Sequence, residues 1–133
     1  MSQQRELLEP FPTKVTKTVD KGFGPIQFVS WTDKLQRLLQ VCGGFDWEVS
    51  DPFQSGDTNE SVGVRGRLTV TIDNTVRVVE GIGTDRDAKK AETDAFARAC
   101  AKIGLGLHLW TQGGEKDGGY WLPKVLDREA GDE

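Results

Sequence analysis

The sequence predicts an α+β protein in which an antiparallel sheet packs against a long alanine-rich helix, a β-β-β-α core preceded by a shorter helix. Three observations predict this class. Apolar residues recur at helical spacing over 31–42, apolar and polar residues alternate from 62 to 82, and alanines recur at helical spacing over 86–103. The length of 133 residues suits one domain of this kind.

Residues 1–24 are predicted to form an irregular arm, because Pro10 and Pro12 punctuate a short apolar segment and lysines follow at intervals. Such an arm either covers its own domain or clasps a neighbouring subunit. These residues do not resemble a signal peptide, and no apolar run in the chain is long enough to span a membrane. Cys42 and Cys100 show no CxxC spacing, which favours reduced thiols packed in the core. We therefore expect a cytoplasmic protein with no membrane partner.

The first predicted helix covers 31–42, with apolar residues at positions 31, 35, 38, 39 and 42. Ser30 or Thr32 can cap its start, and Gly43-Gly44 can end it. Residues 45–49 then alternate between apolar and polar side chains, which predicts a short strand with one buried face. The polar stretch 51–61 is expected to be a loop.

A long hairpin is predicted next, from Val62 through a turn at 73–75 to a second strand that ends near residue 83. A three-residue loop would place Ile72 opposite Val76 and Val70 opposite Val78. We prefer this register because a two-residue loop would put Arg77 among the apolar residues.

In that register, three arginines share one solvent face of the hairpin with two glycines. Cations beside bare backbone form a candidate track for phosphates. The alternative interpretation is a solvated sheet face whose charges protect its edges. The residues concerned are Arg65, Arg67, Arg77, Gly81 and Gly83.

The second helix is predicted over 86–103 with Thr84 as its cap. Its alanine stripe (Ala88, Ala91, Ala95, Ala99, then Ile103) would let its backbone lie close to the sheet. Arg86, Lys89 and Lys90 crowd its first turn, where the helix dipole disfavours cations unless an anion joins them.

Arg98 and Lys102 form a second basic pair one turn apart on this helix. An ordinary surface ladder of ion pairs through Lys90, Asp94 and Arg98 explains the charges equally well. The spacing of the residues leaves both interpretations open.

The motifs of catalysis are absent from the sequence. It contains no GxxxxGK[ST], no GxSxG and no HExxH, so we expect no enzyme activity, no nucleotide or other cofactor and no metal. His108 is the sole histidine, and we expect it to serve in packing or on the surface. The net charge of −4 disfavours DNA binding by the chain as a whole, but 111–133 contributes −3 of it, so a local basic patch remains compatible with the composition.

Four sequence segments, taken in their order along the chain, resemble the Rad fifty-two superfamily of single-strand annealing proteins. Within it they resemble the branch of the bacterial DNA damage response protein A and phage annealing proteins. The segments are VRGRLTV at 64–70, EGIG at 80–83, KKAETDAFARA at 89–99 and KIGLG at 102–106. The segments LEPFP, GGFDW and WLP fit the same branch, so the match covers roughly 7–123. Between the arm at 1–24 and an acidic tail at 124–133, the resemblance implies an annealing domain over 25–123, from a bacterial cell or a phage-infected host.

The resemblance further implies ATP-independent binding and annealing of single-stranded DNA, or protection of its 3′ ends, in recombination and repair. It implies a homo-oligomeric ring of around ten subunits with the strand in a basic groove, and a recombinase or single-strand-binding protein as a partner. The residues expected to contact DNA are Lys34, Arg65, Arg67, Arg77, Lys89, Lys90, Arg98 and Lys102. The chain departs from the family at Asp33, Ala97 and Ala101, where the family has basic residues, so its groove is expected to be less basic.

A double-stranded RNA-binding domain is the alternative function. It too has a glycine-flanked strand followed by a helix that opens with lysines, and residues 62–103 alone fit it. The proline-rich segment before the first helix and the roughly thirty residues after the last one disfavour it.

Overall fold

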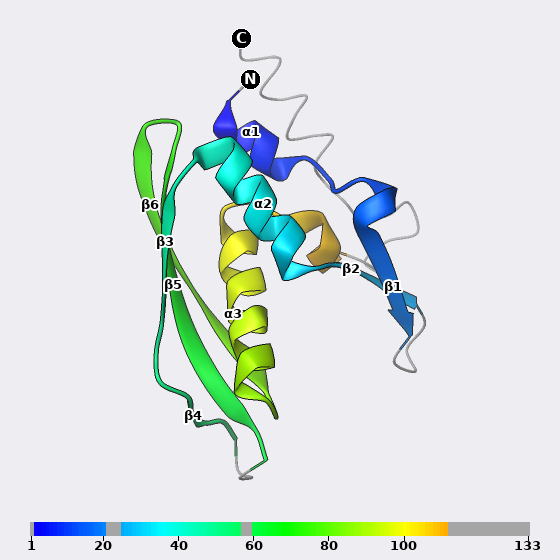
Figure 1. The fold of residues 1–133 in the computed structure, drawn as a ribbon, viewed down its shortest axis with the longest axis vertical. Coiled ribbons are helices and arrows are strands. Elements are labelled where there is room, and N and C mark those ends of the chain that lie inside the picture. The colour runs from blue at the N-terminus through cyan, green and yellow to red at the C-terminus, as the bar shows by residue number, and fades with distance from the viewer. Residues whose placement is uncertain (1, 21–24, 57–59, 112–133) are drawn as a thin grey trace.

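The computed structural model describes residues 2–20, 25–56 and 60–111 (Figure 1). The described part is a mixed α+β structure with antiparallel sheets, as predicted. In chain order its elements are α1 (Gln3–Leu8), η1 (Thr13–Val15), β1 (Thr16–Asp20), β2 (Pro25–Val29), α2 (Trp31–Cys42), β3 (Phe45–Val49), β4 (Phe53–Gln54), β5 (Val62–Ile72), β6 (Thr75–Asp85), α3 (Ala88–Lys102) and η2 (Leu107–Thr111). The predicted acidic tail and the aromatic residues Tyr120 and Trp121 lie outside the described residues.

The main sheet is built around β5, the strand with the long alternating pattern. β6 pairs with β5 along its whole length on one side, while β3 and then β4 pair with it on the other. β4 lies in the segment 51–61, where we expected only a loop. It forms because Phe53 pairs with Gly63, whose missing side chain leaves room for the phenyl ring.

The turn between β5 and β6 has two residues and not the three that we predicted. Asp73 and Asn74 have φ of 50° and 67°, the left-handed values that a two-residue hairpin turn requires and that Asp and Asn tolerate. Ile72 therefore pairs with Thr75 and Val70 pairs with Arg77. The predicted pairing is wrong by one residue of β6, so every side chain of that strand lies on the opposite face from the one expected.

This register turns three apolar residues of β6 toward solvent. Val76, Val78 and Ile82 lie on the face away from α3 and are 63%, 56% and 49% exposed. We call the side of the sheet that carries these residues and Arg65 and Arg67 the open face. The side against α3 is the helix face.

α3 packs on the helix face against β5 and β6 (Figure 1). Gly81 and Gly83 lie beneath it and not on the predicted arginine face: a Cβ added at either glycine would run into the helix backbone. The predicted stripe on the helix is confirmed for Ala91, Ala95, Ala99 and Ile103, all buried, whereas Ala88 is exposed. Bare backbone on the strand and methyl groups on the helix together permit this close approach.

The start of α3 differs from the prediction by two residues. Its cap is Asp87, whose carboxylate accepts a hydrogen bond from the Lys89 N–H at 2.8 Å. Thr84, the predicted cap, belongs to β6, and its N–H donates to Asp94 of the helix at 3.2 Å.

The N-terminal residues begin with a helix where we expected an irregular arm. α1 packs on α2, and its Leu7 is fully buried. Gln3 exchanges hydrogen bonds with Asp73 of the β5–β6 turn, and Gln4 donates to the Ile103 carbonyl at 2.8 Å. The first residues of the arm therefore cover their own domain, which is one of the two roles that we considered for it. The β1–β2 hairpin that follows was not predicted.

α2 has the predicted bounds, with Ser30 at its N-cap position and Gly43 at its end with φ of 78°. Leu38 of its apolar stripe is fully buried, but Trp31 and Leu39 are half exposed. Among the described helices, none has the length and apolar character that crossing a membrane would demand.

Candidate nucleic-acid interface

The structure distributes the eight predicted DNA contacts over four separate places. Arg65 and Arg67 lie on the open face, Arg77 lies on the helix face near the turn, and Lys34 lies buried on α2. The remaining four, Lys89, Lys90, Arg98 and Lys102, are exposed along α3. No single groove of one subunit therefore contains all eight among the described residues.

On the open face the arginines are neutralised by carboxylates. Arg65 and Arg67 both pair with Glu80, at 4.0 and 3.5 Å, and Glu48 stands directly opposite Arg67 on β3. Asp46 lies on the same face, two residues from Glu48 on β3 and opposite Thr69. Two arginines against three carboxylates give this group a net charge of −1. The predicted phosphate track therefore lacks the net positive charge that it would need.

Arg77 does not share a face with Arg65 and Arg67, which corrects the predicted cluster. The two-residue turn places it opposite Val70 on the helix face, where it is half-buried. Its Nη1 donates to the Gln4 side-chain oxygen at 3.3 Å. The polar end of α1 thus accommodates a cation that the hairpin alone would have left among apolar side chains.

Four exposed cations lie along α3, more than at any other of these places, and we call them the α3 ridge. At about 100° per residue, Lys90, Arg98 and Lys102 share one side of the helix, while Lys89 lies on the flank toward α2 and β3. Asp94 lies beside the α3 ridge and accepts a hydrogen bond from Arg98 Nε at 3.1 Å. The Arg98 guanidinium also lies 5.0 Å from the centre of the Trp110 ring. One half of the alternative ion-pair ladder, from Asp94 to Arg98, is therefore formed. Arg98 is held in place while roughly half of its side chain remains exposed.

Lys34 is the one buried charged residue of the described chain, with 7% of its surface exposed. Burial lowers the pKa of its ammonium group, although Cys100 and Asp94 act in the opposite direction. Gly106 lies over its side chain, since a Cβ there would come within 3.3 Å of Lys34 Cε. Lys34 thus supports the packing of α2 and does not belong to the exposed α3 ridge.

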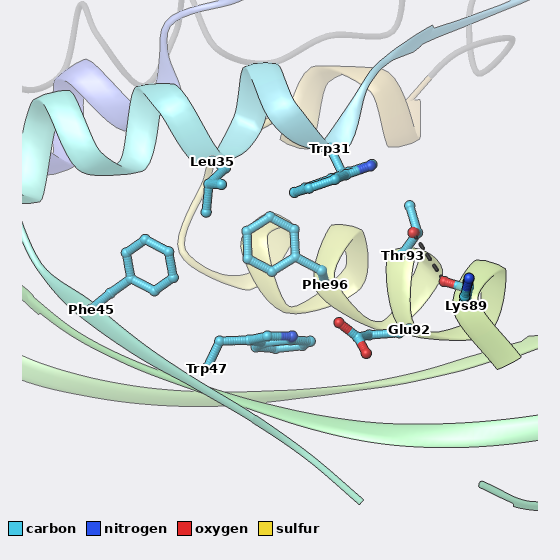
Figure 2. A pocket seen from close by; sticks show the side chains of 8 residues that line it. All are labelled: Trp31, Leu35, Phe45, Trp47, Lys89, Glu92, Thr93 and Phe96. Carbon is cyan, nitrogen blue, oxygen red and sulfur yellow. Dashed lines mark hydrogen bonds between the residues drawn. The ribbon is translucent and has the colours of Figure 1, made fainter.

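A pocket of about 340 Å³ opens between α2, β3 and α3, and we had not predicted it. Its wall is mainly aromatic and aliphatic, with Trp31 and Leu35 from α2, Phe45 and Trp47 from β3, and Phe96 from α3; Lys89, Glu92 and Thr93 form its polar side. Figure 2 shows Trp31 on the α2 side and Trp47 on the sheet side, with Phe96 between them. The available sequence signal was the place of Trp31, which belongs to the apolar stripe of α2 but is the first residue of the helix.

The walls of this aromatic pocket are held by close packing. Trp47 and Phe96 meet edge to face with ring centres 5.1 Å apart. The Trp47 indole lies over Gly66 of β5, where a Cβ would collide with the ring. Trp31, in contrast, is 50% exposed, so one side of the pocket borders on solvent.

His108 packs against Phe11, as expected for a histidine in a structural role. Its Nε2 accepts a hydrogen bond from the Phe11 N–H at 3.4 Å, and the two rings are 6.0 Å apart. Burial lowers the pKa of the imidazole, and the nearby charges of Arg37 and Lys34 lower it further. Cys42 and Cys100 are free thiols, and Cys100 is fully buried. Within residues 2–20, 25–56 and 60–111, the histidine, cysteines and carboxylates do not gather into a group able to hold a metal ion.

Neither the protein-family models nor the curated proteins contain a match to this chain.

Proposed function

We propose that this chain binds single-stranded DNA through its phosphates and promotes annealing, or protects 3′ ends, without hydrolysing a nucleotide. The observation that carries the proposal is the α3 ridge. α3 has four cations and two carboxylates, a net charge of +2, and all four cations are exposed. The ridge falls within 81–106, the block of sequence that most resembles the Rad fifty-two superfamily.

The proposed mechanism is passive. Lysine and arginine side chains of α3 hold the phosphates, so that bases stay available to a complementary strand. Formation of base pairs supplies the free energy, so neither a cofactor nor a catalytic residue is needed. Ala97 and Ala101 stand where the family has basic residues, and the affinity is accordingly expected to be modest.

Assembly of several copies is part of the proposal. Val76, Val78 and Ile82 form an exposed apolar row on the open face, beside a charge group that is nearly neutral. In the described part of the chain β6 pairs only with β5, so its other edge offers backbone hydrogen-bonding groups. An apolar row next to a strand edge is a surface that a second copy can cover, and repeated head-to-tail contacts of this kind form a ring where the rotation between copies closes.

DNA binding is tested by fluorescence anisotropy with a labelled single strand over a series of salt concentrations. Lys90→Ala and Arg98→Ala should each weaken binding and reduce the slope of log affinity against log salt by about one. Arg65→Ala should have a smaller effect, because Glu80 already neutralises that side chain. Unchanged affinity and slope in both α3 variants would refute the ridge as the site. Tighter binding of duplex RNA than of single-stranded DNA would refute the proposed substrate in favour of the RNA-binding alternative.

Assembly is tested by light scattering on the whole chain and on Val78→Asp. We expect an oligomer for the parent and a smaller species for the variant, because the substitution places a charge in the apolar row. Leu39→Asp, on a half-exposed residue of α2, is the matched control and should keep the mass of the parent. A monomeric parent at the concentrations that bind DNA would contradict the proposed oligomer.

A further inference from the structure

The aromatic pocket beside α3 has the composition of a site for a flat ring. Five of its eight lining residues are aromatic or aliphatic, and its volume of about 340 Å³ is at the lower end of the range of small-ligand pockets. Its polar residues are the neighbours Lys89, Glu92 and Thr93 of α3. One of them, Lys89, is also the first cation of the α3 ridge.

We propose that this pocket receives one unpaired nucleobase of the bound strand, with the adjoining phosphate at Lys89. The inference rests on the proposed function and deepens it, because it assigns a second kind of contact to the same strand: one base is held in the pocket, and the neighbouring bases stay available for pairing. Base–aromatic stacking is tolerant of sequence, since every base presents a π-face, and it is the common partner of a basic surface in proteins that bind single strands.

The two tryptophans supply complementary features of such a site. Trp47 is fixed by Phe96 and Gly66, so it offers a rigid wall that a base can meet without ordering a side chain. Trp31 is half exposed at the start of α2, so its indole is accessible to a ring that enters from solvent. A large aromatic side chain left half exposed beside an apolar pocket gains free energy when a ligand covers it.

The charges at the pocket favour a base inside it and a phosphate outside. The Glu92 carboxylate would repel a phosphate that entered the pocket, whereas the Lys89 ammonium attracts one on its own side. Thr93 donates its hydroxyl hydrogen to the Lys89 carbonyl at 3.1 Å, which leaves its oxygen able to accept a hydrogen bond (Figure 2). A nucleotide whose base enters the pocket and whose phosphate stays outside pairs the phosphate with Lys89, keeps it away from Glu92 and offers the base to the Thr93 hydroxyl.

The test compares two oligomers of equal length on the full chain, an oligothymidylate and one whose sugars carry no bases. Stacking of one base on aromatic side chains corresponds to about 5- to 150-fold in affinity. We expect the parent to bind the abasic oligomer more weakly by a factor in this range. Trp31→Ala should lose a similar factor on the oligothymidylate and little on the abasic oligomer.

Two further variants make the result interpretable. Trp31→Phe keeps an aromatic ring and should restore most of the affinity, whereas Leu39→Ala changes an equally exposed residue of the same helix outside the pocket and should bind as the parent does. Circular dichroism checks whether Trp31→Ala is folded. If Trp31→Ala is unfolded, Trp31→Ser at the same exposed position is used in its place.

The outcomes separate this inference from the function on which it rests. If the parent binds both oligomers equally, or Trp31→Ala binds the oligothymidylate as tightly as the parent, the base site is refuted while phosphate binding stands. If the parent binds neither oligomer, the proposed function fails and the base site fails with it. If Trp31→Ala changes only the mass of the assembly, the pocket is a contact between copies and the base site is refuted.

Discussion

Replacement of Gly83 by alanine tests the close packing of α3 on the sheet. The added Cβ would fall well inside the 3.0 Å limit of real Cβ contacts, against the carbonyl oxygen of Ala91 and the amide nitrogen of Ala95. These two atoms are the partners of one i→i+4 hydrogen bond of α3. Both are backbone atoms, so no side chain can rotate away and the helix itself must move. Overpacking of this kind costs about 1–3 kcal/mol, and we expect a value in the upper half of that range.

The matched control is Gly44→Ala at the end of α2. No atom lies within 4 Å of a Cβ at Gly44, so this variant reports only the lower entropy of the unfolded chain, a gain of about 0.4–1 kcal/mol. The two variants should therefore differ by about 2–4 kcal/mol in their free energy of unfolding, measured by urea denaturation followed by circular dichroism. If Gly83→Ala stays within about 0.5 kcal/mol of the parent, as an ordinary surface substitution would, α3 does not lie on the glycines as described.

Three further predictions concern the turn, the histidine and the thiols. Asn74→Ala should lower the free energy of unfolding by about 1–2 kcal/mol and Asn74→Gly should not, because residue 74 has positive φ; urea denaturation of both variants checks this. The lowered pKa of His108 means that the unfolded chain binds the proton more readily, so stability should fall as the pH drops below 6.5, and His108→Gln should flatten this part of a pH series of melting temperatures. Burial raises the pKa of the Cys100 thiol to about 12, so mass spectrometry should find iodoacetamide on Cys42 before Cys100, which is labelled only after unfolding; equal labelling of both native thiols would contradict its burial.

The sequence predicted the elements whose patterns are long. The twelve residues of α2 and the buried face of β5 were correct, because each rests on a long local periodicity. The strand at 45–49 also formed, but its predicted buried face is only partly buried at Phe45 and Trp47, and Val49 is 44% exposed. α1 and the β1–β2 hairpin were missed. α1 has only six residues, and it is held by contacts of Gln3 and Gln4 with residues 70 and 99 positions away, which no local pattern reveals.

The register of β6 failed for a physical reason that concerns Arg77. We rejected the two-residue turn because it buried this residue among apolar side chains, yet the chemistry of Asp73 and Asn74 favoured that turn. The preference of Asp73 and Asn74 for positive φ was therefore the better guide to the register. Burial of Arg77 is acceptable because Gln4 of α1, 73 residues away in the sequence, accepts its hydrogen bond.

In the candidate site, too, features set by local spacing were predicted and features set by residues distant in the sequence were missed. The exposed cations of α3 followed from helical spacing alone, but the burial of Lys34 depends on its packing with Gly106, which is distant in sequence. The aromatic pocket needs the convergence of α2, β3 and α3, and sequence reasoning treated Trp31 as one more member of an apolar stripe. Its place as the first residue of the helix was the available sign that it does not belong to the core.

The two faces of the sheet differ in the partners that they suit. A phosphate backbone laid over the open face would meet Arg65 and Arg67 together with more carboxylates than arginines, so attraction and repulsion would nearly cancel. A protein surface that covered Val78 and its neighbours would instead gain from apolar burial, and the arginines would keep Glu80 as a partner. On the helix side the balance is reversed, because the α3 ridge has net positive charge and its cations remain exposed. Within the proposed function, this asymmetry assigns assembly to the open face and the DNA strand to α3, and the aromatic pocket at Lys89 adjoins the surface that the strand would occupy.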